Sequence, residues 1–174
     1  LSKHRKVPKT MTRFLCNNVA SPTRRLALKG MVSLVGLTTL GASAAFAQTR
    51  PLMEVWKDPN CGCCKDWVKL MSDAGFNIKT YDTGNRAKRK QLGLPEKLGS
   101  CHTALVNGYV VEGHIPVSAI QRLLKEKQTA LGITVPGMPI GSPGMDGPEY
   151  GGRKDPFNVL LVQTDGSTRV WQVG

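Results

Sequence analysis

From residue 51 onward, apolar and polar side chains alternate in several short stretches, which is typical of strands with one buried face. Residues 51–58 (PLMEVWKD) and 76–83 (FNIKTYDT) alternate in this way. Residues 103–112 (TALVNGYVVE) hold two apolar runs on either side of Asn107-Gly108, a dipeptide that suits the tight type I′ turn of a hairpin. We therefore predict two single strands followed by a hairpin.

Three other stretches have the spacing or the composition of helices. In residues 63–75 (CCKDWVKLMSDAG) and 117–128 (VSAIQRLLKEKQ), apolar residues recur every three or four positions. Residues 85–95 (NRAKRKQLGLP) predict a shorter helix, which Gly93 and Pro95 end. The predicted order is strand, helix, strand, helix, two strands and a helix.

The composition then shifts, because residues 132–156 are dense in glycine and proline and include two methionines. We expect no regular element there, and a loop of this length in a compact domain is usually functional or disordered. Residues 157–173 predict a closing hairpin across Asp165-Gly166. A dithiol that opens the first helix after the first strand is the layout of a thioredoxin-like domain. We predict an α/β, thioredoxin-like fold with a central mixed sheet, flanking helices, a long Gly/Pro/Met loop and a C-terminal hairpin.

The start of the chain predicts an export signal rather than part of this domain. Arg24-Arg25 precedes the uncharged stretch MVSLVGLTTLGASAAFAQ, which has the length of a signal-peptide core and is too weakly apolar to predict a membrane span. The paired arginines favour the twin-arginine export route. An ordinary secretory signal or an uncleaved anchor is the alternative.

An A-x-A cleavage signature ends at Ala47, so we predict a signal peptide at 1–47 and a mature domain at 48–174. Met11, rather than Leu1, would give a leader of more typical length. We expect the mature domain to lie in the periplasm, with no stable membrane insertion after cleavage.

The leader also carries most of the positive charge. The formal net charge is +12, and residues 1–47 contribute eight basic and no acidic residues, which leaves +4 on the mature chain. This argues against a nucleic-acid partner. The basic run RAKRK at 86–90 remains, and we interpret it as a solvated helix face.

Three thiols within four positions are the unusual feature of the mature chain. Cys61, Cys63 and Cys64 are followed only by Cys101. In an oxidising compartment, a Cys61–Cys64 bridge of C-x-x-C form is the best single disulfide, but it leaves two odd thiols. The sequence C-H-T at 101–103 stands where a thioredoxin-like domain normally has a cis-proline opposite its dithiol. We therefore expect Cys101 and the following histidine to lie beside the three clustered thiols.

These residues form a set of soft and borderline metal donors. Thiolate and thioether ligands select Cu(I), and imidazole suits copper or zinc. Because cysteine sulfur can bridge two metals, four clustered thiols favour a multinuclear Cu(I) site over a redox pair, which needs only two. Each histidine has an alternative role as a hydrogen-bonded structural residue, and each methionine as a packing anchor for the loop. The candidate ligands are Cys61, Cys63, Cys64, Cys101, His102, His114, Met138 and Met145.

The motifs VWKDPNCGCCKDW, SCHTALVNGYVVEGHIP and VPGMPIGSPGM, in this order, resemble those of the DUF411 family, which includes the CopG-type periplasmic copper-resistance proteins. The resemblance runs from about Met53 to Met145 and beyond. It implies a thioredoxin-like fold, a cysteine-bridged Cu(I) cluster and a role in copper tolerance. It also implies that the cysteines, histidines and methionines named above are copper ligands.

Three functions remain open on the sequence. The first is an exported copper-binding protein, whose partners are copper ions and other copper-handling proteins. The second is a thiol–disulfide oxidoreductase that uses Cys61 and Cys64, with a copper-dependent redox protein lying between the two. The third is a structural zinc site with four cysteines, in which the adjacent Cys63 and Cys64 would be cramped.

Overall fold

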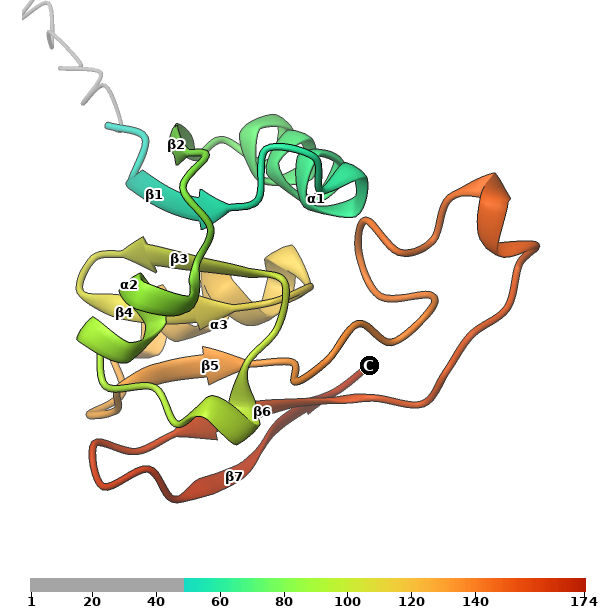
Figure 1. Ribbon diagram of the computed structural model, residues 1–174. Helices are drawn as coiled ribbons and strands as arrows, with labels where there is room; N and C mark the ends of the chain where they lie inside the picture. The colour runs from blue at the N-terminus through green and yellow to red at the C-terminus, as the bar shows by residue number, and fades with distance from the viewer. Residues whose placement is uncertain (1–48) are drawn as a thin grey trace, which may run out of the picture. The chain divides into compact units, whose positions relative to one another are not determined.

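The first strand, β1, buries every second side chain, so its alternation has the predicted physical cause. The structure is a computed structural model that describes residues 49–174, and the predicted export signal at 1–47 lies outside the described residues. Within the described part of the chain, the helices are all too short or too polar to cross a membrane. The elements, drawn in Figure 1, are β1 (Leu52–Lys57), α1 (Gly62–Asp73), β2 (Asn77–Tyr81), α2 (Arg86–Gln91), η1 (Glu96–Leu98), β3 (His102–Val106), β4 (Tyr109–Glu112), α3 (Val117–Glu126), β5 (Gly132–Thr134), η2 (Pro148–Tyr150), β6 (Asn158–Val162) and β7 (Thr168–Val173).

Seven strands form one mixed sheet in the order β2-β1-β3-β4-β5-β6-β7. β1 runs parallel to β2 and antiparallel to β3, β3 and β4 form the predicted hairpin, and β6 and β7 form the closing one. The predicted α/β class, the mixed sheet and the C-terminal hairpin are therefore confirmed. The thioredoxin-like assignment stays an interpretation, and the order β2-β1-β3-β4 agrees with it.

The expectation that residues 132–156 hold no regular element was wrong. Residues 132–134 form β5, which pairs with both β4 and β6, and a turn of 3₁₀-helix, η2, lies further along. Gly132 is required by this pairing, because a Cβ atom there would lie 1.9 Å from the carbonyl oxygen of Val110. The glycine that seemed to break the strand is thus what allows the strand to approach β4.

Apolar side chains cover both faces of the sheet. The larger cluster joins β1, β3 and β4 to α1 and α3 and includes Trp67, Met71 and Leu123. The indole Nε1 of Trp67 donates to the carbonyl of Ile115 at 3.0 Å, so this large side chain is buried without an unpaired donor. In a smaller cluster, Val110 of β4 and Val162 of β6 pack against Leu94 and Leu98, which lie in and before η1. These two clusters hold the strands of the sheet in place against α1, α3 and the η1 segment.

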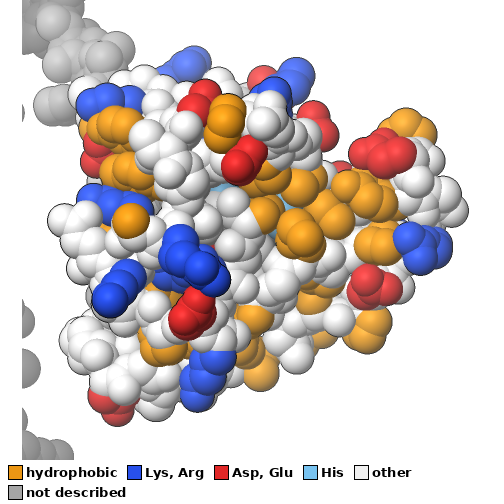
Figure 2. Space-filling view, in the orientation of Figure 1, with side chains coloured by type: hydrophobic (Ala, Val, Ile, Leu, Met, Phe, Trp, Pro, Cys, Tyr) orange, Lys and Arg blue, Asp and Glu red, His pale blue; other side chains and the backbone are white. Residues whose placement is uncertain are grey.

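The basic run at 86–90 is not simply a solvated helix face. It forms α2, and Figure 2 shows Lys and Arg side chains gathered on this side of the molecule. Arg86 is highly exposed, but the side chain of Arg89 is only 11% exposed and forms an ion pair with Glu112, which is fully buried. The prediction for this run was therefore wrong at Arg89.

Glu112 is the centre of a buried polar network. Its Oε1 accepts from the Ser100 backbone N–H at 2.7 Å and from Arg89 at 3.1 Å, and its Oε2 accepts from Thr103 at 2.5 Å. Burial raises the pKa of Glu112 to about 7, although Thr103, Ser100 and Arg89 all act to lower it. Each carboxylate oxygen is thus occupied, as a buried polar group requires.

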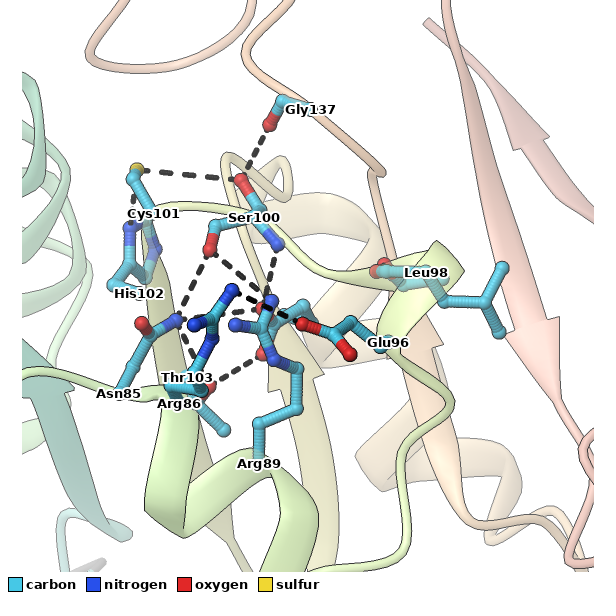
Figure 3. A network of polar contacts seen from close by, with 12 residues as sticks. Asn85, Arg86, Arg89, Glu96, Leu98, Ser100, Cys101, His102, Thr103 and Gly137 are labelled. Atoms are coloured by element: carbon cyan, nitrogen blue, oxygen red, sulfur yellow. Dashed lines mark hydrogen bonds and ion pairs between the residues drawn. The ribbon is translucent and has the colours of Figure 1, made fainter.

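This network fixes the peptide that precedes Cys101 (Figure 3). The Ser100 carbonyl accepts from the Asn85 side-chain amide at 3.0 Å. The Ser100 N–H donates to the carboxylate of Glu112. The Ser100 hydroxyl donates to the carbonyl of Gly137, which ties the same residue to the long loop. Both ends of the residue before Cys101 are therefore held in place.

We predict that Glu112→Ala lowers the free energy of unfolding by about 3 kcal/mol, because it leaves the nearly buried Arg89 guanidinium without its partner. Urea denaturation of the metal-free chain measures this change. Glu96→Ala is the control, because the Arg86–Glu96 pair is exposed on both sides and its loss should change stability little. Equal losses in the two variants would show that the buried network has no special role.

Candidate metal centre

The three clustered thiols surround the first turn of α1. Cys61 is the N-cap residue, and its sulfur accepts the backbone N–H of Cys64 at 3.3 Å. Cys61 and Cys64 are joined by a disulfide, with their Cα atoms 5.3 Å apart, and Cys63 is free.

The structure brings Cys101 to these thiols, as the sequence predicted. Cys101 precedes β3, and its Sγ lies 3.4 Å from the Sγ of Cys64. The Sγ of Cys63 lies 3.5 Å from that of Cys61. The four sulfurs all lie within 4.8 Å of one another, with Cys64 buried and the other three half-buried. A metal that enters this group would meet sulfur donors from two segments.

Both predicted histidines lie against Cys101. Its sulfur is 3.1 Å from Nε2 of His114 and 3.4 Å from Nδ1 of His102. One donor atom from each of these three residues lies within 4.8 Å of the others, so Cys101 belongs both to this group and to the four-sulfur group. His114 is held by a hydrogen bond of 2.8 Å from Nδ1 to the carbonyl of Pro143, which leaves Nε2 facing the thiol.

Burial keeps these groups uncharged in the metal-free protein. It raises the pKa of the Cys101 thiol to about 12, with a further contribution from Cys63. It lowers the pKa of His102 to about 3, together with the nearby His114, and lowers the pKa of His114 as well. Neutral imidazole is the form that binds metal, and a bound cation would displace the thiol proton of Cys101.

The long loop folds against the cysteines. Gly144 has φ +81°, and a Cβ atom at this position would lie 2.7 Å from the carbonyl oxygen of Cys63 and 2.9 Å from the backbone nitrogen of Trp67. Figure 1 shows this segment beside the start of α1, and Figure 2 shows hydrophobic side chains gathered over the same region. Close contact at Gly144 therefore depends on the absence of a side chain.

The two predicted methionines lie in different surroundings. Met145 is only 7% exposed, and its sulfur accepts a hydrogen bond from the Tyr150 hydroxyl at 3.3 Å. Met138 follows the residue that contacts Ser100 and is 53% exposed. The anchoring alternative agrees with the burial of Met145 and disagrees with the exposure of Met138. Ligation by either thioether stays a prediction.

Sequence reasoning missed two residues that contact neighbours of the cysteines or a candidate ligand. Tyr150 bonds to Met145, and its pKa is raised by partial burial and by the nearby charges of Cys63 and Glu149. Glu112 holds the Ser100 peptide as described above. A charged residue in an otherwise apolar strand was the available signal for Glu112, whereas nothing in the local pattern marked Tyr150.

Comparisons with known proteins agree with this geometry. The family model described as "Protein of unknown function, DUF411" matches residues 98–145. Two solved structures titled "Copper resistance protein copG", Form 2 and Form 1, are similar to the chain. Form 2 has 38% sequence identity and a TM-score of 0.66, covering 72% of this chain and 98% of the other. Form 1 has 39% identity and a TM-score of 0.65, covering 71% and 96%.

No curated protein matches the chain. The structural matches nevertheless extend over nearly the full length of both relatives at well above 30% identity. The family match at residues 98–145 includes Cys101, His102 and His114. The chain belongs to the DUF411 family of CopG-type copper-resistance proteins.

Proposed function

We propose that this protein is an exported copper-binding protein that holds Cu(I) as a cysteine-bridged multinuclear cluster, in copper resistance or homeostasis. The observation that carries the proposal is the convergence of the four sulfurs of Cys61, Cys63, Cys64 and Cys101 within 4.8 Å. Thiolates favour soft metals such as Cu(I), and a thiolate can bridge two copper ions. The relatives titled copper resistance protein support copper as the metal.

A cluster gives each of the four thiols a role. A single disulfide uses only Cys61 and Cys64 and leaves Cys63 and Cys101 free. Reduction of this bridge would provide four thiols, two of them in the first turn of α1, and a bound cation would displace their protons. Three of the four cysteines are half-buried, so copper ions could reach and leave the site.

The remaining predicted ligands would complete the coordination. His102 and His114 are neutral and lie against Cys101, which suits a secondary nitrogen ligand. Met138 and Met145 would supply thioethers from the loop. We propose export to the periplasm by the twin-arginine route, with copper ions and other copper-handling proteins as partners. Neither nucleic acid nor a stable membrane insertion is part of this proposal.

A redox function is the second candidate, because Cys61 and Cys64 form a disulfide in C-x-x-C form. Either a thiol–disulfide oxidoreductase or a copper-dependent redox protein would use this pair. Position 102, where a cis-proline would be expected, is a histidine, and residues 49–174 contain no cis peptide bond. Four thiols could also form a closed tetrahedral zinc site, but zinc is less favoured because the adjacent Cys63 and Cys64 would be cramped as ligands of one ion.

We predict that Cys63→Ser abolishes multinuclear copper binding. The chain is reduced, loaded anaerobically with Cu(I) and desalted, and copper per chain is measured by elemental analysis. Two or more copper ions per chain are expected in the unmodified chain and in the control Cys16→Ser, which removes the leader thiol. Full copper content in Cys63→Ser would refute the cluster. No copper in the unmodified chain, with a reversible Cys61–Cys64 bridge, would favour the oxidoreductase.

We also predict that Met138→Ala and Met145→Leu each weaken Cu(I) binding by about tenfold, equivalent to about 1.4 kcal/mol. Leucine is chosen at the buried position because it preserves side-chain volume. A competition titration with a chromogenic Cu(I) chelator measures the affinity, and thermal unfolding of the metal-free chains shows that they stay folded. Leu52→Ala, at an exposed apolar position on β1, is the control. Unchanged affinity would assign the methionines to the loop alone.

A further inference from the structure

Closure of the Cys61–Cys64 disulfide removes two sulfurs from the four-sulfur group but leaves a second donor group complete. We propose that, in this disulfide form, Cys101, His102 and His114 make a separate site for one copper ion bound by one sulfur and two nitrogens. The proposal rests on copper being the metal of the proposed function. It adds that the thiol state of Cys61 and Cys64 determines how many copper ions the protein holds.

The three donor atoms are already close to the separation that a metal requires. With a metal–sulfur bond of about 2.3 Å and a metal–nitrogen bond of about 2.0–2.1 Å at a tetrahedral angle, sulfur and nitrogen lie about 3.6 Å apart. Cys101 Sγ is 3.1 Å from His114 Nε2 and 3.4 Å from His102 Nδ1. The two sulfur–nitrogen pairs would therefore open by only a few tenths of an ångström to admit an ion, and one nitrogen of each ring lies within 4.8 Å of the other.

His114 has the support that metal-binding histidines commonly have. Its Nδ1 hydrogen bonds to the carbonyl of Pro143 at 2.8 Å, which fixes the ring and leaves Nε2 as the bare nitrogen. This nitrogen faces the sulfur of Cys101. The carbonyl comes from the long loop, so the loop that covers the cysteines also orients this histidine.

His102 is a buried side chain whose hydrogen-bonding capacity is only partly used. It is fully buried, packed beside Trp67 and His114 at ring-centroid distances of 4.3 and 5.0 Å. Its Nδ1 contacts only the Cys101 sulfur, and its Nε2 is the one buried side-chain nitrogen or oxygen within residues 49–174 that has no hydrogen-bond partner. A cation bound at Nδ1 would therefore displace only the weak contact with the Cys101 thiol, whereas the unpartnered Nε2 is a different ring atom and would not be its ligand.

This group does not depend on the thiols in the bridge. Cys101 lies 3.4 Å from the sulfur of Cys64 but is free when the disulfide is closed. One thiolate with two imidazoles is a donor set that suits copper, whereas the all-sulfur group favours Cu(I) in particular. Because Cys101 belongs to both groups, the two sites are alternatives within a single centre.

The test uses the full chain carrying Cys16→Ser, oxidised so that peptide mapping shows a Cys61–Cys64 bridge. Cu(I) is added anaerobically with a competing chelator, the chain is desalted, and X-ray absorption counts sulfur and nitrogen ligands. We expect one copper per chain with one sulfur and two nitrogens. His114→Gln should lower the affinity at least about tenfold, and Cys101→Ser should abolish binding.

Cys63→Ser separates this site from the proposed cluster. In the oxidised chain it should leave the single copper in place, although the reduced variant loses the cluster. Loss of the copper in the oxidised variant, or sulfur-only ligation, would overturn the proposal in favour of a Cys63–Cys101 pair. A Cys61→Ala/Cys64→Ala chain, which needs no oxidation, should also bind one copper, and failure to do so would overturn it. If the reduced unmodified chain held no cluster while the oxidised chain bound one copper, only the proposed function would fail.

Discussion

The antiparallel pairing of β1 with β3 is the constraint on which the candidate centre depends. Its register sets Lys57 opposite His102 and Trp56 opposite Thr103, so the end of β1 lies beside the start of β3. The chain leaves β1 toward Cys61 and enters β3 from Cys101. Two cysteine-bearing segments that are distant in sequence are therefore brought to a sulfur–sulfur separation of 3.4 Å by strand pairing rather than by the cysteines themselves.

The surroundings of Cys101 are unusually polar for a protein interior. Glu112, His102 and His114 are all fully buried, and Arg89 is nearly so. Buried ion pairs are weak sources of net stability, because desolvation offsets most of their attraction. What the Glu112 network does achieve is geometric, since it holds the Ser100 peptide at both ends. The buried polar groups thus lie where they fix the backbone next to the Cys101 thiol.

The sequence was sufficient for features that local patterns encode. Alternation located β1 and the two hairpins, and element order placed Cys101 and His102 beside the clustered thiols. It failed at β5, because the close approach that requires Gly132 is made by Val110 on another strand. It also missed the pairing of Arg89 with Glu112 and the Pro143 carbonyl at His114, since neither a tertiary contact nor a backbone carbonyl leaves a local signal. Which donors bind metal stays a prediction.

Cys101 connects the chemistry of the two donor groups. Its sulfur contacts Cys64 on one side and both imidazoles on the other. A copper ion bound to this sulfur would have both thiolate and nitrogen neighbours at hand, because the donor atoms of each group lie within 4.8 Å of one another and Cys101 belongs to both groups. The same residue is only half-buried, and the hydrogen-bonded Ser100 peptide that precedes it holds its backbone in place. A change in the thiol state of Cys61 and Cys64 would therefore act on copper through one positioned atom, and no movement of the sheet would be needed.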